Sequence, residues 1–153
     1  MKLILLYIYL AFALPSCVNN EAQDGKVVGV IDGDTFDMMQ GGKKIRVRMF
    51  GIDAPERKQD YYQKSKEALS SMIFQKRVRL KSKGRDRYKR ELAEVYVGDK
   101  WINYEMVYAG MAWHFTRYSK DARVAKAEQL ARTAKRGLWS MKAVAPWEFR
   151  RPG

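Results

Sequence analysis

Two short segments place four carboxylates and one arginine within 25 residues of each other. The first, Ile-Asp-Gly-Asp-Thr, contains Asp32 and Asp34. The second, Arg-Met-Phe-Gly-Ile-Asp-Ala-Pro-Glu, contains Arg48, Asp53 and Glu56. Carboxylates that converge repel one another, by roughly 4 kcal/mol for a pair at about 4 Å and an effective dielectric constant near 20. A fold that tolerates such a cluster usually holds a cation there, and oxygen ligands alone favour Ca²⁺ or Mg²⁺.

The first segment has two interpretations. On an extended chain Asp32 and Asp34 project from the same face, and Gly33 between them permits a close approach of the backbone to a neighbour. The alternative is an ordinary Asp-Gly turn between two strands, which is common in proteins. Taken alone, this segment favours the turn.

The second segment is equally ambiguous by itself. Pro55 biases Ala54 away from the helical region, which leaves the Ala54 carbonyl free to face a ligand. Alternatively Asp53 caps a helix and Glu56 completes a capping box. Arg48, which lies on the polar face of an alternating strand pattern, could simply be solvated.

The surrounding pattern predicts the elements that must position these residues. Alternating and β-prone runs predict five short strands, and the pair Gly41-Gly42 predicts a hairpin. Asn103 is a plausible helix N-cap and Gly137 a helix C-cap. The predicted strands are 26–31, 35–39, 44–50, a segment around Val78 and Leu80, and 91–97; the predicted helices are 61–74, 103–109 and 121–136, with loops at 51–60 and 82–89. This order favours a β-rich α+β fold, an OB-type five-stranded barrel with about three helices.

The charge of the chain predicts a polyanionic partner. The 153 residues carry a formal net charge of +13, and 17 of the 30 Lys and Arg residues lie in segment 43–90 with only five acidic residues. Attraction to anionic lipid usually involves a basic amphipathic helix, whereas this charge lies on predicted strands and loops. Nucleic acid is therefore the favoured partner.

The N-terminus predicts export. Lys2 precedes a short apolar run, as in a secretory signal peptide, which we place at 1–16; the run is short for a membrane span, although an uncleaved anchor is the alternative. Cys17 is the only cysteine, so no intramolecular disulfide can form. Its position resembles a lipoprotein signal, and ordinary secretion is the other reading. Segment 17–25 is predicted as a linker and 26–150 as the folded domain. We expect a monomer that is secreted or held at the cell envelope.

Taken together, the motifs resemble the staphylococcal nuclease (thermonuclease) family. The two acidic segments are followed by Asp-Arg-Tyr-Lys-Arg at 86–90, where the family has Asp-x-Tyr-Gly-Arg. Further matching pieces are Tyr-Ser-Lys-Asp at 118–121, Gly-Leu-Trp at 137–139 and Pro-Trp-Glu-Phe-Arg at 146–150. The resemblance covers 26–150, and three motifs in order at suitable spacing are specific, whereas any one alone is weak.

The resemblance implies roles for individual residues. Asp34 and Asp53 would bind Ca²⁺ directly, Ala54 would add its main-chain carbonyl, and Asp32 would act through water. Glu56 would be the general base, and Arg48 and Arg90 would clamp the scissile phosphate; otherwise Arg90 is one more charge in a basic patch. The expected nucleic-acid contacts are Arg87, Tyr88 and Tyr118.

The implied activity is Ca²⁺-dependent phosphodiester hydrolysis of DNA and RNA, preferring single strands, with little sequence specificity and 3′-phosphate products. The main alternative is a non-catalytic OB-type nucleic-acid-binding module of the cell envelope. A third is a basic envelope protein that binds anionic lipid or glycan. One departure bears on the site: Lys89 stands where the family has glycine, and a positive φ there would strain it.

Overall fold

Five strands close into a mixed β-barrel. The computed structural model describes residues 23–151. The strands are β1 (Gln23–Val30), β2 (Thr35–Gln40), β3 (Lys43–Met49), β5 (Arg77–Arg85) and β6 (Glu91–Val97). Neighbouring strands are antiparallel in the order β3-β2-β1-β5-β6, and a parallel pairing of β3 with β6 closes the ring. The predicted OB-type barrel is confirmed.

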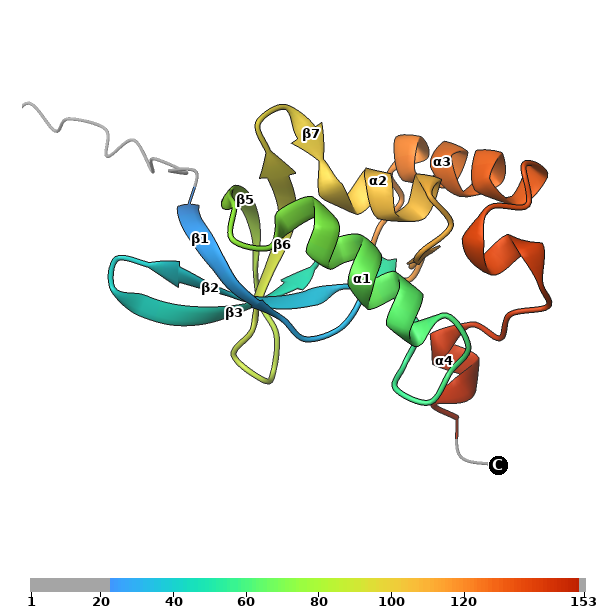
Figure 1. Ribbon diagram of the computed structural model, residues 1–153, viewed down its shortest axis with the longest axis horizontal. Coiled ribbons are helices and arrows are strands. Elements are labelled where there is room, and N and C mark those ends of the chain that lie inside the picture. Colours follow the sequence, from blue (N-terminus) through green and yellow to red (C-terminus); the bar gives the residue numbers. More distant parts are fainter. Residues whose placement is uncertain (1–22, 152–153) are drawn as a thin grey trace, which may run out of the picture.

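Helices cover one end of this barrel and one side of it. They are α1 (Tyr62–Ile73), α2 (Ile102–Tyr108), α3 (Ala122–Thr133) and the short α4 (Pro146–Phe149), with a 3-10 helix at Gly137–Ser140. In Figure 1, α1 runs across the strands, and the C-terminal segment with α4 lies far from the β2–β3 hairpin. Within residues 23–151, no helix has the length and apolar character needed to cross a bilayer.

The barrel interior and the inner faces of the helices form one core. Phe36 and Val47 from the strands and Leu69, Ile73 and Met106 from the helices are all fully buried. Val47 and Met49 on β3 both point into the core, as the alternation along this strand predicts. Because successive side chains of a strand point to opposite faces, Arg48 between them points away from the core. Core packing therefore fixes the direction of the functional side chains on β3.

Several predicted boundaries are corrected by the structure. β4 (Ile52–Asp53) lies inside the predicted loop 51–60 and pairs with β8 (Trp113–His114), and β7 (Lys100–Trp101) extends the sheet from β6. β5 continues to Arg85, inside the predicted loop 82–89, because it keeps pairing with β6 across a bulge. Helix α3 ends at Thr133, and Gly137 begins the 3-10 helix instead of capping α3.

Asn103 is not the cap of α2, because its side chain is engaged inside the core. Its Oδ1 accepts a hydrogen bond from Val95 N at 2.9 Å, and its Nδ2 donates to the carbonyls of Phe50 at 2.9 Å and Ala93 at 3.3 Å. The N-cap position belongs to Trp101. Asn103 thus ties α2 to the β3 end and to β6.

The N-terminal predictions lie almost entirely outside the described residues. The predicted signal peptide at 1–16 and Cys17 both lie outside the residues that the structure describes. β1 begins at Gln23, and its first residues pair with β5 from Gln23 opposite Leu80. The last three residues of the predicted linker 17–25 are therefore strand residues.

Candidate active site

Asp34 lies immediately before β2, and its carboxylate is buried in the protein. The residue is 5 % exposed. Its backbone N–H donates to Asp32 Oδ1 at 3.1 Å, and its Oδ1 accepts a hydrogen bond from the Thr35 hydroxyl at 3.0 Å. Its Oδ2 accepts the Ala54 N–H at 2.6 Å and lies 3.1 Å from Arg48 Nη2. The two acidic segments are thus joined directly through this carboxylate.

Gly33 makes that connection sterically possible. A Cβ at this position would lie 1.9 Å from Ser65 Oγ and 2.8 Å from the Ala54 Cβ. Ser65 is itself fixed on α1, because its hydroxyl donates to the Met111 carbonyl at 2.7 Å. The close backbone approach that Gly33 permits is present, and it places the Asp34 turn against α1.

Arg48, at the end of β3, binds both buried carboxylates at once. Its Nη2 lies 3.1 Å from Asp34 Oδ2 and 2.9 Å from Asp53 Oδ1. Its Nη1 donates to the carbonyls of Met49 and Ile52, each at 2.9 Å. The planar fork of an arginine suits this arrangement of four acceptors. Arg48 therefore lies between the acids, in contact with both.

Asp53 is held by strand pairing and by two guanidinium groups. It lies on β4, opposite Trp113 of β8, and is 1 % exposed. Its Oδ2 lies 2.7 Å from Arg150 Nη2, and Arg150 Nη1 also bonds to the carboxylate of Glu56. Asp34, Arg48, Asp53, Arg150 and Glu56 form one continuous chain of charge-assisted contacts.

The pKa values within this network of contacts are set by burial of the acids and by their cationic partners. Burial raises the pKa of Asp34 well above its ordinary value; Arg48 opposes this rise, and the charges of Asp32 and Asp53 add to it. The hydrogen bond to Asp53 raises the pKa of Arg150. Arg48 thus stabilises the charged form of Asp34, and Asp53 that of Arg150, whereas burial and the neighbouring carboxylates destabilise charged Asp34.

The acid groups fit a hard divalent cation by their chemistry. The candidate donors are the carboxylates of Asp32, Asp34 and Asp53 and the Ala54 carbonyl, all oxygen atoms, as Ca²⁺ requires. The buried carboxylates of Asp34 and Asp53 face a shared position, which the Arg48 guanidinium occupies in this structure. Among residues 23–151, no group of three His, Cys, Asp or Glu side chains is gathered closely enough to form a metal cluster.

Arg90 is positioned by a tight turn between β5 and β6. Asp86 Oδ1 accepts the N–H groups of Tyr88 at 2.9 Å and Arg90 at 3.0 Å, and Asp86 Oδ2 bonds to Arg90 Nε at 2.7 Å. Burial opposes ionisation of Asp86, but these hydrogen bonds outweigh it, so the pKa of Asp86 is lowered. The ion pair points the guanidinium of Arg90 toward its own loop.

Lys89 has a φ of +63°, in the left-handed region. The expected strain at this glycine position is therefore present, at a typical cost of about 1–2 kcal/mol for a residue with a side chain. Lys89 and Arg90 line a hollow of about 360 Å³ on the surface of the barrel. The other residues that line it are Asp37, Lys44, Arg46 and Tyr88.

The predicted nucleic-acid contacts are all solvent-accessible. Tyr88 is 63 % exposed and Tyr118 is 61 % exposed. The guanidinium of Arg87 lies 4.8 Å from the centre of the Tyr88 ring, and Tyr118 packs edge-on against Phe115 at 5.1 Å. Exposed rings beside cationic groups are suited to base stacking.

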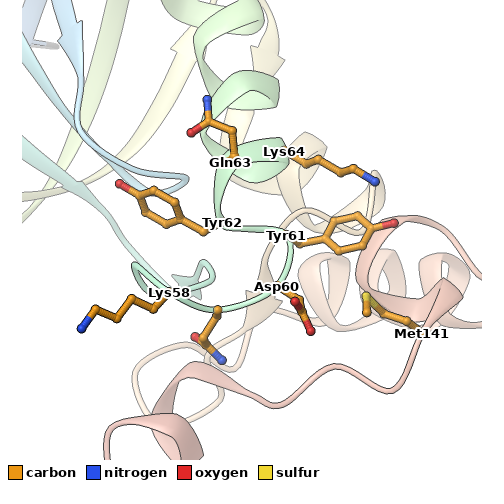
Figure 2. A pocket seen from close by; sticks show the side chains of 8 residues that line it. Lys58, Asp60, Tyr61, Tyr62, Gln63, Lys64 and Met141 are labelled. Carbon is orange, nitrogen blue, oxygen red and sulfur yellow. The ribbon is translucent and has the colours of Figure 1, made fainter.

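A second hollow lies beside the loop that follows Glu56. It has a volume of about 540 Å³ and is lined by residues 58–64 and Met141. Figure 2 shows the rings of Tyr61 and Tyr62 pointing in opposite directions, with Tyr61 on the side of Met141. Tyr61 bonds to Ser140 through the two hydroxyls at 3.1 Å, and Tyr62 donates to the Ile31 carbonyl at 3.3 Å. The loop is thereby fixed between the Asp34 turn and the C-terminal segment.

The structure therefore brings most of the predicted residues together and adds one. Asp32, Asp34, Arg48, Asp53, Ala54 and Glu56 form a connected group. Arg90 instead contacts Asp86 and the ring of Tyr88, both in its own loop. Arg150 was missed as a site residue, because it lies 94 positions from Glu56 in the sequence. The only signal was its place at the end of the matching run at 146–150.

Comparison with known proteins shows the family of the chain. A sequence model of the family described as "Staphylococcal nuclease homologue" matches residues 46–141. A protein of Haemophilus influenzae named "Uncharacterized endonuclease" is 42 % identical over 152 residues, 98 % of this chain and 85 % of the relative. One of Escherichia coli O157:H7 with the same name is 43 % identical over 128 residues, 82 % of this chain and 84 % of the relative. The "Micrococcal nuclease" of Shigella flexneri is 38 % identical over 139 residues, 83 % of this chain and 80 % of the relative. The chain belongs to the staphylococcal nuclease family.

Proposed function

We propose that this nuclease is a Ca²⁺-dependent phosphodiesterase that hydrolyses DNA and RNA with little sequence specificity and leaves 3′-phosphate ends. The observation that carries the proposal is the continuous network from Asp34 through Arg48 and Asp53 to Glu56, at the end of a strongly basic barrel. Membership in a nuclease family and relatives named as endonucleases support the same reaction class.

Phosphodiester hydrolysis needs a base for the attacking water and positive charge for the extra negative charge of the transition state. Glu56 is the proposed base, since it is a carboxylate with a side chain 39 % exposed and thus accessible to water. Asp34, Asp53 and the Ala54 carbonyl would hold Ca²⁺, with Asp32 acting through water; the bound ion would polarise the phosphate. Arg48 and Arg90 are the proposed phosphate clamps. Phosphate binding requires Arg48 to exchange or share its contacts with Asp34 and Asp53, and Arg90 its contact with Asp86.

Substrate recognition follows from the surface around this site. Segment 43–90 carries most of the net charge, and a basic groove contacts the backbone of a nucleic acid instead of reading base edges. Arg87, Tyr88 and Tyr118 supply the exposed cation and rings expected for single strands. We propose single-stranded DNA and RNA as preferred substrates of a monomeric enzyme that is secreted or anchored at the cell envelope through Cys17.

The test is digestion of a single-stranded oligonucleotide by Glu56→Gln with Ca²⁺ and with a chelator. General-base removal should lower kcat by about 10²–10⁴-fold while the dissociation constant of the oligonucleotide stays within a few-fold. Glu67→Gln, on the exposed face of α1, removes the same charge and should digest normally. Mass spectrometry of wild-type products should find 3′-phosphate ends.

The alternative of a non-catalytic binding module makes the opposite prediction. It predicts oligonucleotide binding without turnover by the wild-type protein in either buffer. If turnover is present and Glu56→Gln loses binding in step with turnover, the assignment of Glu56 as base is wrong. Turnover that is equal in chelator and in Ca²⁺ would contradict the metal requirement.

A further inference from the structure

The C-terminal arm, residues 141–151, packs firmly beside the candidate active site. Trp147 stacks on Phe115 with ring centres 5.3 Å apart and planes at 8°, and it meets Trp113 edge-on at 6.4 Å. Trp113 is buried and belongs to β8, the partner of the strand that carries Asp53. The arm is therefore anchored through a rigid aromatic contact on the strand pair that positions a proposed metal ligand.

A second contact ties the arm to the backbone of the proposed base. The Gln59 side chain donates through Nε2 to the Val144 carbonyl at 2.9 Å, and its Oε1 accepts the Glu56 N–H at 2.8 Å. One amide thus bridges the arm and the residue whose carboxylate would take a proton. This fixes the distance between the arm and the Glu56 backbone.

The arm ends in a guanidinium placed over two acidic side chains. The short helix α4 sets the position of Arg150, because the backbone N–H of Arg150 donates to the Pro146 carbonyl at 3.0 Å. Arg150 Nη2 lies 2.7 Å from Asp53 Oδ2, and Nη1 lies 3.3 Å from Asp53 Oδ1 and bonds to Glu56 Oε1. Because the fork is planar and rigid, it holds the two carboxylates in a fixed relation that a lysine could not reproduce.

We propose that Arg150 is a positioning residue of the nuclease site: it orients Glu56 against Asp53, and its charge competes with the divalent cation for Asp53. This inference rests on the proposed function. Arg150 acts through Glu56, so losing it should slow the reaction. It also adds a positive charge at a carboxylate that must bind Ca²⁺, so losing it should tighten ion binding. Opposite changes in the two quantities separate this role from a general loss of structure.

The test compares Arg150→Ala, Arg150→Lys and the control Arg151→Ala, which removes the same charge from the neighbouring exposed position. Calorimetric titration without substrate measures the Ca²⁺ dissociation constant. The arginine side chain is 43 % exposed. Because a side chain this exposed is screened by water, removing its repulsion of Ca²⁺ should lower the Ca²⁺ dissociation constant of Arg150→Ala only about tenfold. Loss of an orienting partner should lower kcat by about 10–100-fold with a KM near that of the wild type. Arg150→Lys should keep wild-type Ca²⁺ affinity and recover only part of kcat.

A third readout needs neither ion nor substrate. In chelator, Arg150→Ala should melt roughly 5 °C below Arg151→Ala, because buried Asp53 loses one of its two cationic partners. Saturating Ca²⁺ should reduce this difference, since the ion replaces the missing charge at Asp53.

Three results would overturn the inference alone: Ca²⁺ affinity of Arg150→Ala equal to or weaker than wild type, unchanged or increased kcat, or equal melting of the two alanine variants in chelator. An increased kcat would make the arm an inhibitor instead of a positioning element. If wild type and all variants neither bind Ca²⁺ nor digest nucleic acid, the proposed function fails and the inference fails with it. The two failures are therefore distinguishable.

Discussion

Removing Arg48 should cost far more stability than removing Arg46 from the same strand. Arg48 contacts two carboxylates that are 5 % and 1 % exposed, Asp34 and Asp53, and its own side chain is 15 % exposed. Breaking a buried ion pair by deleting one partner typically costs about 3–5 kcal/mol, because the remaining charge is left uncompensated. Here Asp34 would lose its cationic partner, while Asp53 would keep Arg150. Arg46 pairs with Asp37, which is also buried, but the Arg46 side chain is 48 % exposed and Lys44 lies 3.8 Å from the same carboxylate. Because Asp37 keeps a cationic partner, losing Arg46 should cost about 1 kcal/mol or less.

Urea unfolding in chelator, followed by tryptophan fluorescence, measures this difference. With a urea dependence of about 2 kcal/mol per M, Arg48→Ala should lower the midpoint by about 2 M and Arg46→Ala by about 0.5 M or less. Asp34→Asn in the Arg48→Ala background should restore part of the loss, since one unpaired charge is removed. Equal midpoints for the two arginine variants, or no restoration in the double variant, would refute the argument that Arg48 neutralises both acids.

Three further predictions concern other parts of the molecule. Lys89→Gly should raise the free energy of unfolding by about 1 kcal/mol by relieving a positive φ, whereas Lys89→Ala, which keeps a Cβ, should give no gain. A hydrogen bond from Arg123 lowers the pKa of Asp121 to about 2 on folding, so this carboxylate stabilises the fold at pH above its unfolded pKa near 3.8 and loses that contribution as the pH falls toward 2. Asp121→Asn should be less stable than wild type at pH 5 and converge with it near pH 2; a constant difference would contradict this. The affinity for single-stranded DNA should fall with salt, with a slope of about −0.7 for each neutralised phosphate in a plot of log affinity against log salt, and a flat response would contradict an electrostatic groove.

The strands could be predicted well because alternation and runs of β-prone residues are local signals. Predicted strand 91–97 has the bounds that β6 shows, and the inward face of β3 is as expected, with Val47 and Met49 buried. Helix α1 also lies within one residue of its predicted range at each end. In these segments the periodicity of apolar residues and the packing of the core agree.

Where the sequence misled, long-range contacts decided the structure. Asn103 is a good local cap, but its amide bonds across the core to β6 and to the carbonyl of Phe50. β4 and β8 are two residues each and form through their mutual pairing, which no short window of sequence contains. The sequence indicated that Gly33 permits a close backbone approach, but it did not show that Ser65 is the residue approached.

The candidate site was predicted in its members but not in its arrangement. The two acidic motifs converge, yet Arg48, which was expected to clamp the phosphate, lies between Asp34 and Asp53 and contacts both. Burial explains this, since two desolvated carboxylates draw the nearest guanidinium into contact. Arg90 was expected to face the phosphate and instead pairs with Asp86, four residues earlier in the same turn. Neither preference for a partner is visible in residue spacing.

The most direct test of a cation held by the acids of the barrel is a Ca²⁺ titration of turnover for wild type, Asp34→Asn and the control Asp99→Asn, which lies on an exposed turn. Initial rates of oligonucleotide cleavage give the Ca²⁺ concentration at half-maximal activity. Loss of a charged ligand should raise this concentration by about 10–100-fold in Asp34→Asn, with Asp99→Asn unchanged. Superimposable titrations of Asp34→Asn and wild type would show that Asp34 does not bind the ion, and would contradict the account of the site.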